Sequence, residues 1–228
     1  MRSLTGIFAI ALTLALTACS EEQAEAPAAP PAKTETAPPA AAPDPTPAGD
    51  AGSNNDEASA QAEPFFAQMV LGDVTFQVES PNDSSINQVT VRAEGPEGPI
   101  GQMEAEADGT ITNVEIEDIN ADGYPEIYVY VTSAGSGSYG SLIAYASNQN
   151  KSLSQIYLPS IEDDPAISQG YMGHDEFAVG EGAFLRRFPI YKDGDPNAQP
   201  TGGTRQIQYK LEAGEAGWIL RQDRVVEF

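Results

Sequence analysis

Nine residues near the middle of the chain, 133–141 (SAGSGSYGS), combine hydroxyl groups with glycines and carry no charge. Glycine lacks a Cβ, so this segment can adopt positive φ angles and approach another surface closely. Ser136, Ser138 and Tyr139 each carry a hydroxyl that can donate a hydrogen bond. The chemistry of such a segment is neutral hydrogen bonding on a narrow loop. An ordinary Gly- and Ser-rich hairpin turn is the alternative that the composition leaves open.

A second constellation, residues 118–126, reads D-x-N-x-D-G-x-x-E. Its oxygen ligands would be Asp118, Asn120, Asp122 and Glu126, and Ca²⁺ prefers such hard oxygens. The segment is too short for an EF-hand and is closer to the short calcium loops found between strands. Asp, Asn and Gly also form turns in which side chains bond the local backbone without a metal. No cofactor is required, and a bound calcium ion would be structural.

The chain has one histidine, His174, which stands beside Asp175 and Glu176. It could act as a base or a metal ligand, and a solvated loop residue is the simpler interpretation. Neither a Gly-x-Ser-x-Gly elbow nor a His-Glu-x-x-His motif is present in the sequence. We therefore expect a protein that is not an enzyme, and assign no catalytic residue.

Apolar and polar residues alternate with period two along much of the chain from residue 63, which is typical of strands. Turn signals such as Asp108-Gly109 and Asp193-Gly194 separate the alternating runs. This pattern predicts an all-β fold, a single antiparallel β-sandwich of about eight to ten short strands. The candidate strands are Val70–Val78, Gln88–Arg92, Thr110–Ile116, Glu126–Thr132, Ser141–Ser147, Ser154–Leu158, Phe184–Tyr191, Arg205–Leu211 and Trp218–Val226.

The first residues predict an exported lipoprotein. Residues 1–18 have a basic start and a short apolar run, and Leu16-Thr17-Ala18-Cys19 has the form of a lipobox. Cys19, the only cysteine, would carry the lipid, and Ser20 after it favours sorting to the outer membrane of a Gram-negative bacterium. Residues 19–62 are rich in Ala, Pro and Glu and predict a disordered tether. Residues 63–228 have the size of one domain.

The charge balance indicates which partners are suitable. The chain holds 34 acidic and 11 basic residues, a formal net charge of −23. Such a charge repels nucleic acid and anionic lipid, so membrane contact is expected only through the lipid anchor. A negative field steers a basic partner toward the protein. Solubility alone is the other explanation of this charge.

The segment Ser136-Gly137-Ser138-Tyr139 resembles the SGxY loop of the periplasmic inhibitors of i-type (invertebrate) lysozyme. The similarity is read over about residues 66–222 and is most family-like from Asp118 to Pro159. It includes Asp122-Gly123-Tyr124-Pro125-Glu126 and the run 151–159 (KSLSQIYLP). In that family the fold is an antiparallel β-sandwich, often dimeric, and the Ser and Tyr of the loop enter the lysozyme active site.

The resemblance implies an inhibitor of lysozyme, of the i-type because the domain has no cysteine. Ser136 and Tyr139 would then bond the catalytic carboxyls, while Gly137, Ser138 and Gly140 would shape the loop. The partner would be a basic lysozyme, and a homodimer is a further expectation. The lipobox and long tether depart from family members that are soluble in the periplasm. The runner-up function is a calcium-dependent module that binds an envelope glycan or protein.

Overall fold

The computed structural model describes residues 63–180 and 182–228. The expected signal peptide, Cys19 and the tether lie outside these residues. Strands form about 59% of the described residues and helices about 4%, which confirms the all-β class. The strands are β1 (Phe65–Leu71), β2 (Val74–Ser80), β3 (Ile86–Gly95), β4 (Gly98–Asp108), β5 (Thr110–Glu117), β6 (Glu126–Thr132), β7 (Gly140–Asn148), β8 (Ser152–Tyr157), β9 (Glu176–Gly180), β10 (Ala183–Pro189), β11 (Thr204–Ala213) and β12 (Trp218–Glu227).

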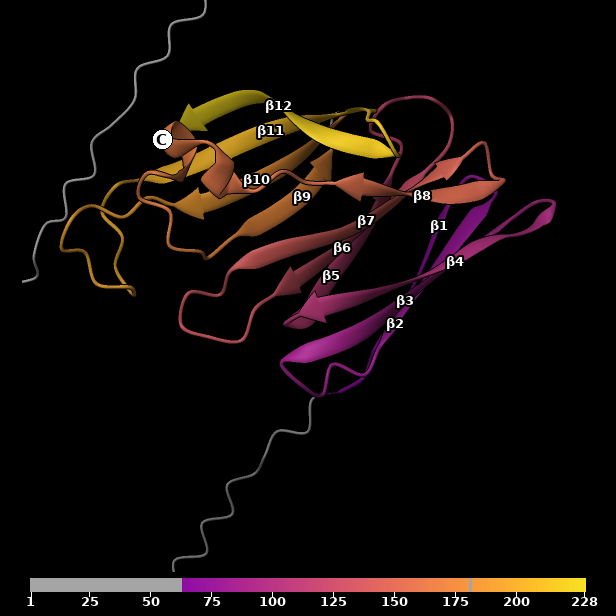
Figure 1. The fold of residues 1–228 in the computed structure, drawn as a ribbon, viewed down its shortest axis with the longest axis horizontal. Coiled ribbons are helices and arrows are strands. Elements are labelled where there is room, and N and C mark those ends of the chain that lie inside the picture. The colour runs from indigo at the N-terminus through magenta and orange to yellow at the C-terminus, as the bar shows by residue number, and fades with distance from the viewer. Residues whose placement is uncertain (1–62, 181) are drawn as a thin grey trace, which may run out of the picture. The chain divides into compact units, whose positions relative to one another are not determined.

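The strands form two sheets (Figure 1). The first has four antiparallel strands in the order β1-β2-β3-β4. The second has eight strands in the order β5-β6-β7-β8-β12-β11-β10-β9, and only the short β8–β12 pairing is parallel. This large sheet curls until its two edge strands lie near each other, where the Val179 backbone N–H of β9 donates to Glu115 Oε2 of β5 at 3.0 Å. The large sheet is therefore nearly barrel-shaped.

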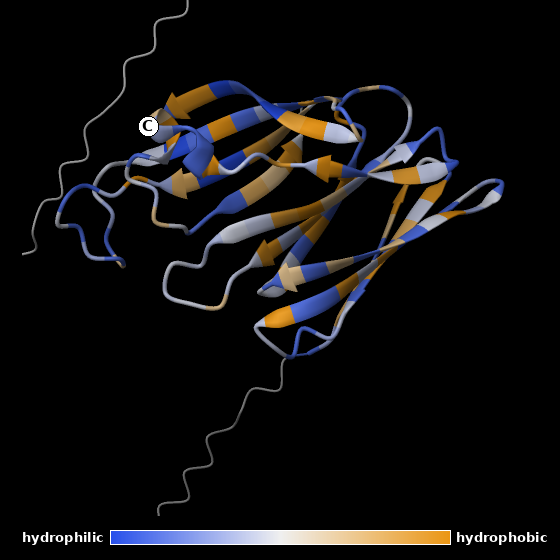
Figure 2. Cartoon of the chain, in the orientation of Figure 1, coloured by the Kyte–Doolittle hydropathy of each residue, from blue (hydrophilic) through white to orange (hydrophobic). Residues whose placement is uncertain are grey.

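Two hydrophobic cores result from this arrangement. The first lies between the four-stranded sheet and β5–β7, and includes Phe76, Val91 and Val129. The second lies inside the curl of the large sheet, where Phe184 stacks against Tyr128 with ring centroids 5.7 Å apart. Figure 2 shows the alternation of apolar and polar residues along most strands that directs one face of each toward a core.

Strand β6 separates the two cores, because its side chains alternate between them. Ile127, Val129 and Val131 pack into the first core, and Tyr128 and Tyr130 pack into the second. The strand is consequently buried on both faces, and its sequence (EIYVYVT) is almost uninterrupted in apolar and aromatic residues. Burial on both faces fixes the position of the loop that follows Thr132.

The prediction of eight to ten strands in a single sandwich holds only in part, because the structure has twelve strands and its large sheet curls around a second core, so the two sheets do not form a clear single sandwich. The predicted strand Val70–Val78 is two strands, joined by a hairpin turn at Gly72, whose φ is +59°. Strands β4 and β9 were not predicted. Both are edge strands of their sheets. The other eight predicted ranges each overlap a strand.

Two short helical turns, a 3₁₀ turn at Ile161–Asp163 and α1 (Pro165–Ser168), connect β8 to β9. Asp164 precedes α1 and accepts a hydrogen bond from the Ala166 backbone N–H at 2.9 Å, which caps its first turn. Among the residues that the structure describes, no helix has both the length and the apolar character needed to cross a membrane.

The side chain of Asn82 links the two sheets, because it bonds both backbone polar groups of Ile111 as a neighbouring strand would. Its buried amide donates to the Ile111 carbonyl at 3.0 Å and accepts from the Ile111 backbone N–H at 2.9 Å. We expect Asn82→Ala to lower the free energy of unfolding by about 2–3 kcal/mol, because both polar groups of Ile111 lose their partner. Denaturant unfolding measures this loss. The exposed Asn113→Ala is the control and should change stability by less than about 0.5 kcal/mol. Equal effects of the two substitutions would contradict the prediction.

Candidate functional site

The glycine- and serine-rich loop joins β6 to β7 at one end of this antiparallel strand pair. Ser133 closes its base, since its backbone N–H donates to the Tyr139 carbonyl at 2.9 Å and its Oγ accepts from the Tyr139 N–H at 3.0 Å. Ser138 has a φ of +43°, and its N–H donates to the Gly135 carbonyl at 3.2 Å. These bonds give the loop a defined shape without any charged side chain.

Two of the three hydroxyl-bearing residues at the loop tip are exposed, and Ser138 is half-buried. Ser136 is exposed, and Tyr139 retains 46% of its accessible surface. Within residues 63–180 and 182–228, no hydrogen bond occupies the hydroxyl of Ser136, Ser138 or Tyr139. A Cβ on Gly137 would lie 2.4 Å from Tyr139 Cε2, so the tyrosine ring lies directly against this glycine. The loop is thus uncharged and its hydroxyls are unbonded within the described residues, and the assignment of residues 136–140 as a lysozyme-binding segment stays a prediction.

A buried ion pair lies behind the loop. The fully buried carboxylate of Asp175 accepts a hydrogen bond from Arg186 Nε at 2.7 Å, and accepts from the Gly140 backbone N–H at the same distance. The Tyr171 hydroxyl donates to Asp175 at 2.6 Å, and burial raises the pKa of Tyr171, which keeps this hydroxyl protonated. The Tyr171 ring also meets the Tyr139 ring edge to face, with centroids 5.6 Å apart.

Sequence reasoning did not identify Asp175, Arg186 or Tyr171 as part of this site. Asp175 is 35 residues from Gly140 in the sequence, and its partner Arg186 lies on β10. The one available signal was the arginine itself, because an arginine in an apolar strand must find a buried acid.

His174 does not form a catalytic arrangement. Its ring Nε2 lies 3.3 Å from Oδ1 of Asn197, an amide, and its ring stacks against Tyr191 at 6.3 Å. A general base is normally oriented by a carboxylate or placed against a nucleophile. The role as a base or metal ligand that the sequence left open finds no support in these contacts.

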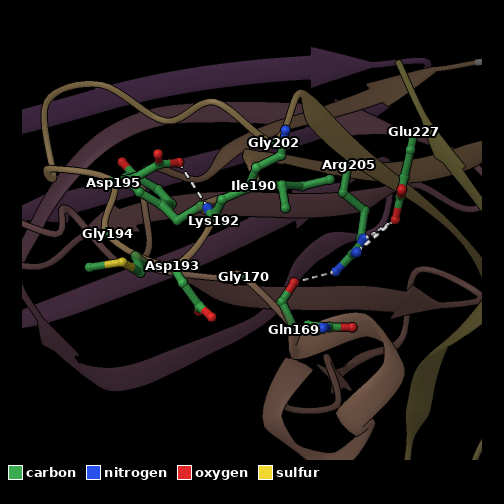
Figure 3. Close-up of a pocket in the computed structure, with 12 residues that line it drawn as sticks. Gln169, Gly170, Ile190, Lys192, Asp193, Gly194, Asp195, Gly202, Arg205 and Glu227 are labelled. Carbon is green, nitrogen blue, oxygen red and sulfur yellow. Dashed lines mark hydrogen bonds and ion pairs between the residues drawn. The ribbon is translucent and has the colours of Figure 1, made fainter.

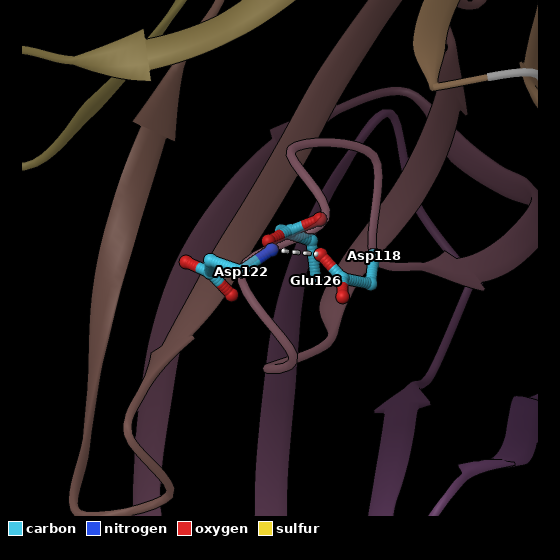
Figure 4. A group of neighbouring side chains, drawn as sticks. All are labelled: Asp118, Asp122 and Glu126. Carbon is cyan, nitrogen blue, oxygen red and sulfur yellow. Dashed lines mark hydrogen bonds between the residues drawn. The ribbon is translucent and has the colours of Figure 1, made fainter.

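Residues 118–126, which we call the acidic loop, bring three of the four predicted metal ligands together (Figure 4). Carboxylate oxygens of Asp118, Asp122 and Glu126 lie within 4.8 Å of one another. Asn120 lies beside them, and its amide donates to Asp122 Oδ2 at 3.1 Å. The loop is also held by backbone bonds, among them the Gly123 N–H to Asp118 at 2.8 Å. The structure thus contains both features that the sequence suggested, clustered oxygens and an internally bonded turn.

Glu126 is the buried member of this cluster. Its carboxylate accepts from the Ile119 backbone N–H at 3.0 Å. Burial, together with the charges of Asp118 and Asp122, raises the pKa of Glu126 to about 8. The half-buried Asp118 and the exposed Asp122, beside the buried Glu126, form a site that a divalent cation would neutralise.

One of two cavities borders residues 133–141, which we call the hydroxyl loop. One, of about 330 Å³, opens beside Tyr139 and is also lined by Leu142, Glu162 and Tyr171. The larger, of about 700 Å³, lies between residues 169–172, which follow α1, and the loop 192–203 (Figure 3). In the larger cavity Arg205 is already bound by Glu227 at 2.6 Å and by the Gln169 carbonyl at 2.9 Å. The guanidinium of Arg205, the strongest hydrogen-bond donor of the larger cavity, is thus already occupied. The smaller cavity is lined by Tyr139 and therefore belongs to the hydroxyl loop.

Comparison with known proteins identifies the family. Residues 100–167 match the family model described as the periplasmic lysozyme inhibitor of i-type lysozyme. This range contains the acidic loop and the hydroxyl loop, whereas Asp175 and Arg186 follow it. No curated protein matches the chain.

Two solved structures resemble the chain. The first is the periplasmic inhibitor of i-type lysozyme from Aeromonas hydrophila, with 31% identity over 40% of this chain and 84% of that chain, and a TM-score of 0.36. The second is the inhibitor of A. hydrophila in complex with Meretrix lusoria lysozyme, with 30% identity over 40% of this chain and 80% of that chain, and a TM-score of 0.35. With 31% identity over 84% of the first relative, this chain belongs to the family of periplasmic inhibitors of i-type lysozyme, which are inhibitors and not enzymes.

Proposed function

We propose that this chain inhibits a lysozyme of the i-type by inserting the loop Ser136–Gly140 into the active-site groove of the enzyme. The observation that carries the proposal is the set of free hydroxyls on an exposed, internally bonded loop within the range matched by the family model. The relative from A. hydrophila, solved in complex with a lysozyme, supports the class of partner.

The chemistry of a lysozyme explains why the loop is neutral. Glycosidases cleave with two carboxyl groups, one of which acts as an acid with a raised pKa. A hydroxyl can donate to a carboxylate and accept from a carboxylic acid, so it suits both protonation states. A carboxylate in the loop would be repelled, and a cation would lose more hydration on entry. Ser136 and Tyr139 are three positions apart and present such hydroxyls.

The surrounding charge serves the approach of the enzyme. The chain carries a net charge of −23, and a basic lysozyme would be steered toward it. Steering of this kind raises the association rate more than the final affinity. The inhibitor therefore combines a long-range acidic field with a loop that is itself uncharged. Its binding would protect bacterial peptidoglycan from hydrolysis.

The expected export and assembly complete the proposal. The family is periplasmic, and Cys19 would anchor this member by lipid to the outer membrane, with residues 19–62 as a tether. A homodimer would form through exposed apolar side chains such as Phe66 and Val70 on the edge strand β1.

A second candidate function is a calcium-dependent binding module, and the clustered carboxylates of Asp118, Asp122 and Glu126 favour a structural ion in either case. Such an ion would stabilise the turn into β6, at the end opposite to the hydroxyl loop. A calcium-dependent module would release its ligand when a chelator removes calcium, and substitution of Ser136 or Tyr139 would not change its binding. An inhibitor would lose affinity for lysozyme when either residue is substituted.

The first prediction concerns the loop hydroxyls. We expect Ser136→Ala and Tyr139→Ala each to weaken inhibition of an i-type lysozyme by about 2 kcal/mol or more, because each removes a central contact of the interface. The measurement is residual lysozyme activity titrated with residues 63–228. Ser85→Ala and Tyr157→Ala remove an exposed serine and tyrosine elsewhere and serve as controls. Inhibition by both loop variants at the wild-type level would exclude the insertion mechanism.

The second prediction concerns calcium. Ca²⁺ should raise the melting temperature of the protein above its value in chelator, because an ion that binds only the folded state stabilises that state. Asp122→Asn, an exposed change, should reduce this difference, and Asp193→Asn, an exposed acid elsewhere, should leave it unchanged. Equal melting temperatures with Ca²⁺ and with chelator would mean that hydrogen bonds alone hold the acidic loop.

The third prediction concerns the anchor. In a Gram-negative host, the full chain should fractionate with the outer membrane, and Cys19→Ser should remove it from that fraction while leaving its inhibitory activity intact. The lipid attached to this cysteine is what would hold the protein at the membrane. A wild-type chain found only in the soluble periplasmic fraction would exclude the anchor without affecting the proposed inhibition.

A further inference from the structure

Residues far along the chain hold the backbone of the hydroxyl loop from behind. The side-chain amide of Asn197 donates to the Ser136 carbonyl at 2.5 Å, and the backbone N–H of His174 donates to the Gly137 carbonyl at 2.7 Å. Asp175 accepts from the Gly140 N–H at 2.7 Å. We call Gly173, His174, Asp175 and Asn197 the loop clamp. All four follow the range 100–167 that the family model matches.

The clamp requires an unusual backbone at Gly173 and His174. Their φ angles are +86° and +58°, both in the left-handed region. A Cβ on Gly173 would lie 2.1 Å from the Gly137 carbonyl oxygen, closer than any two such atoms can approach. Only glycine at this position lets the two loops lie in contact, so that the His174 N–H reaches Gly137.

The clamp is itself anchored on both sides. Asp175 is paired with the buried Arg186, as described above. Asn197 lies in the loop 192–203, where its backbone carbonyl accepts a hydrogen bond from the Tyr191 hydroxyl at 2.8 Å. Asp195 closes that loop by accepting from the backbone N–H groups of Lys192 and Thr201, both at 2.8 Å. These bonds lower the pKa of Asp195, which therefore stays ionised as an acceptor.

The direction of these bonds has a consequence for the hydroxyls. The carbonyls of Ser136 and Gly137 point toward the clamp and are occupied there. The hydroxyls of Ser136, Ser138 and Tyr139 take no part in these bonds, so within the described residues they are left free for a partner. A loop with glycines at 135, 137 and 140 would otherwise sample many conformations, and ordering it during binding would weaken affinity.

We propose that the loop clamp, supplied by the segment beyond the family match, fixes the hydroxyl loop in its inhibitory conformation before lysozyme binds. Gly173, His174, Asp175 and Asn197 are positioning residues, because they act through the loop. This inference rests on the proposed insertion of the loop into the enzyme. It adds that the C-terminal strands β9–β12, with their connecting loops, set the affinity of the inhibitor.

The first arm of the test compares two glycines with matching backbone strain. Gly173 and Gly123 have φ angles of +86° and +89°, but a Cβ on Gly123 would meet nothing within 4 Å, and Gly123 precedes β6 at the end opposite to the loop. Both alanine variants should carry a similar cost of the positive φ, and Gly173→Ala alone adds the clash with the Gly137 carbonyl. Gly173→Ala should raise the Kd for i-type lysozyme at least about tenfold, and Gly123→Ala should change it by less than about twofold.

The second arm uses Asn197 and does not strain the backbone. Asn197→Ala should raise the Kd about two- to tenfold, the range for one neutral hydrogen bond. Asn197→Asp should raise it further, because the carboxylate is nearly isosteric but faces the Ser136 carbonyl. In the free protein, Asn197→Ala should speed hydrogen exchange of the Ser138 and Tyr139 amides while amides of β6 stay protected. A purely structural role for Asn197 would not confine the change to the loop.

The outcomes separate this inference from the proposed function. Wild-type affinity of Gly173→Ala and Asn197→Ala, with weakened Tyr139→Ala, would overturn the clamp and leave insertion of the hydroxyls standing. Reduced affinity of the clamp variants for lysozyme, with wild-type affinity of Tyr139→Ala and Ser136→Ala, would support the clamp and overturn the role of the hydroxyls. Wild-type affinity of all these variants would overturn both.

Discussion

The buried carboxylate of Asp175 is the point on which the arrangement of the site depends. It accepts hydrogen bonds from Arg186, Tyr171 and the Gly140 backbone, and so joins the curled C-terminal strands to the start of β7. A buried charge of this kind is tolerated only when its partners are complete, and removing one partner typically costs 3–5 kcal/mol. The pair thus makes the position of the hydroxyl loop inseparable from the folding of β9 and β10.

Strand β6 supplies the other constraint. Because both of its faces are buried, it cannot shift by one residue without placing Tyr128 and Tyr130 in the core now filled by Ile127, Val129 and Val131. The loop leaves a strand whose register is fixed from two sides. This also explains why the domain has two cores, since one strand serves the four-stranded sheet on one face and the barrel-like curl on the other.

The same architecture reconciles a highly acidic molecule with an uncharged site. Two acids behind the loop are engaged in other bonds, because Asp175 is paired with Arg186 and Asp195 closes the loop 192–203. The loop 133–141 itself contains no carboxylate. Attraction over long distance and hydrogen bonding at contact are separated into different parts of the protein.

The sequence by itself determined the all-β class, most strand positions, the acidic loop and the hydroxyl loop, because each depends on neighbouring residues. Period-two alternation, a Gly-rich interruption between two apolar runs and carboxylates at alternate positions are all local patterns. The strand Glu126–Thr132 was predicted with its observed limits, since its hydrophobicity is continuous. The resemblance to the inhibitor family likewise rested on a short contiguous motif.

Only the tertiary structure decided the division into two sheets, the two cores and the residues behind the loop. No local pattern specifies that β4 and β9 form the edges of their sheets, or that β8 pairs in parallel with β12. The contacts of Asp175 with Gly140 and of Asn197 with Ser136 span 35 and 61 residues. Such contacts depend on how the large sheet curls, which is set by packing of the whole core and not by the residues adjacent in the chain.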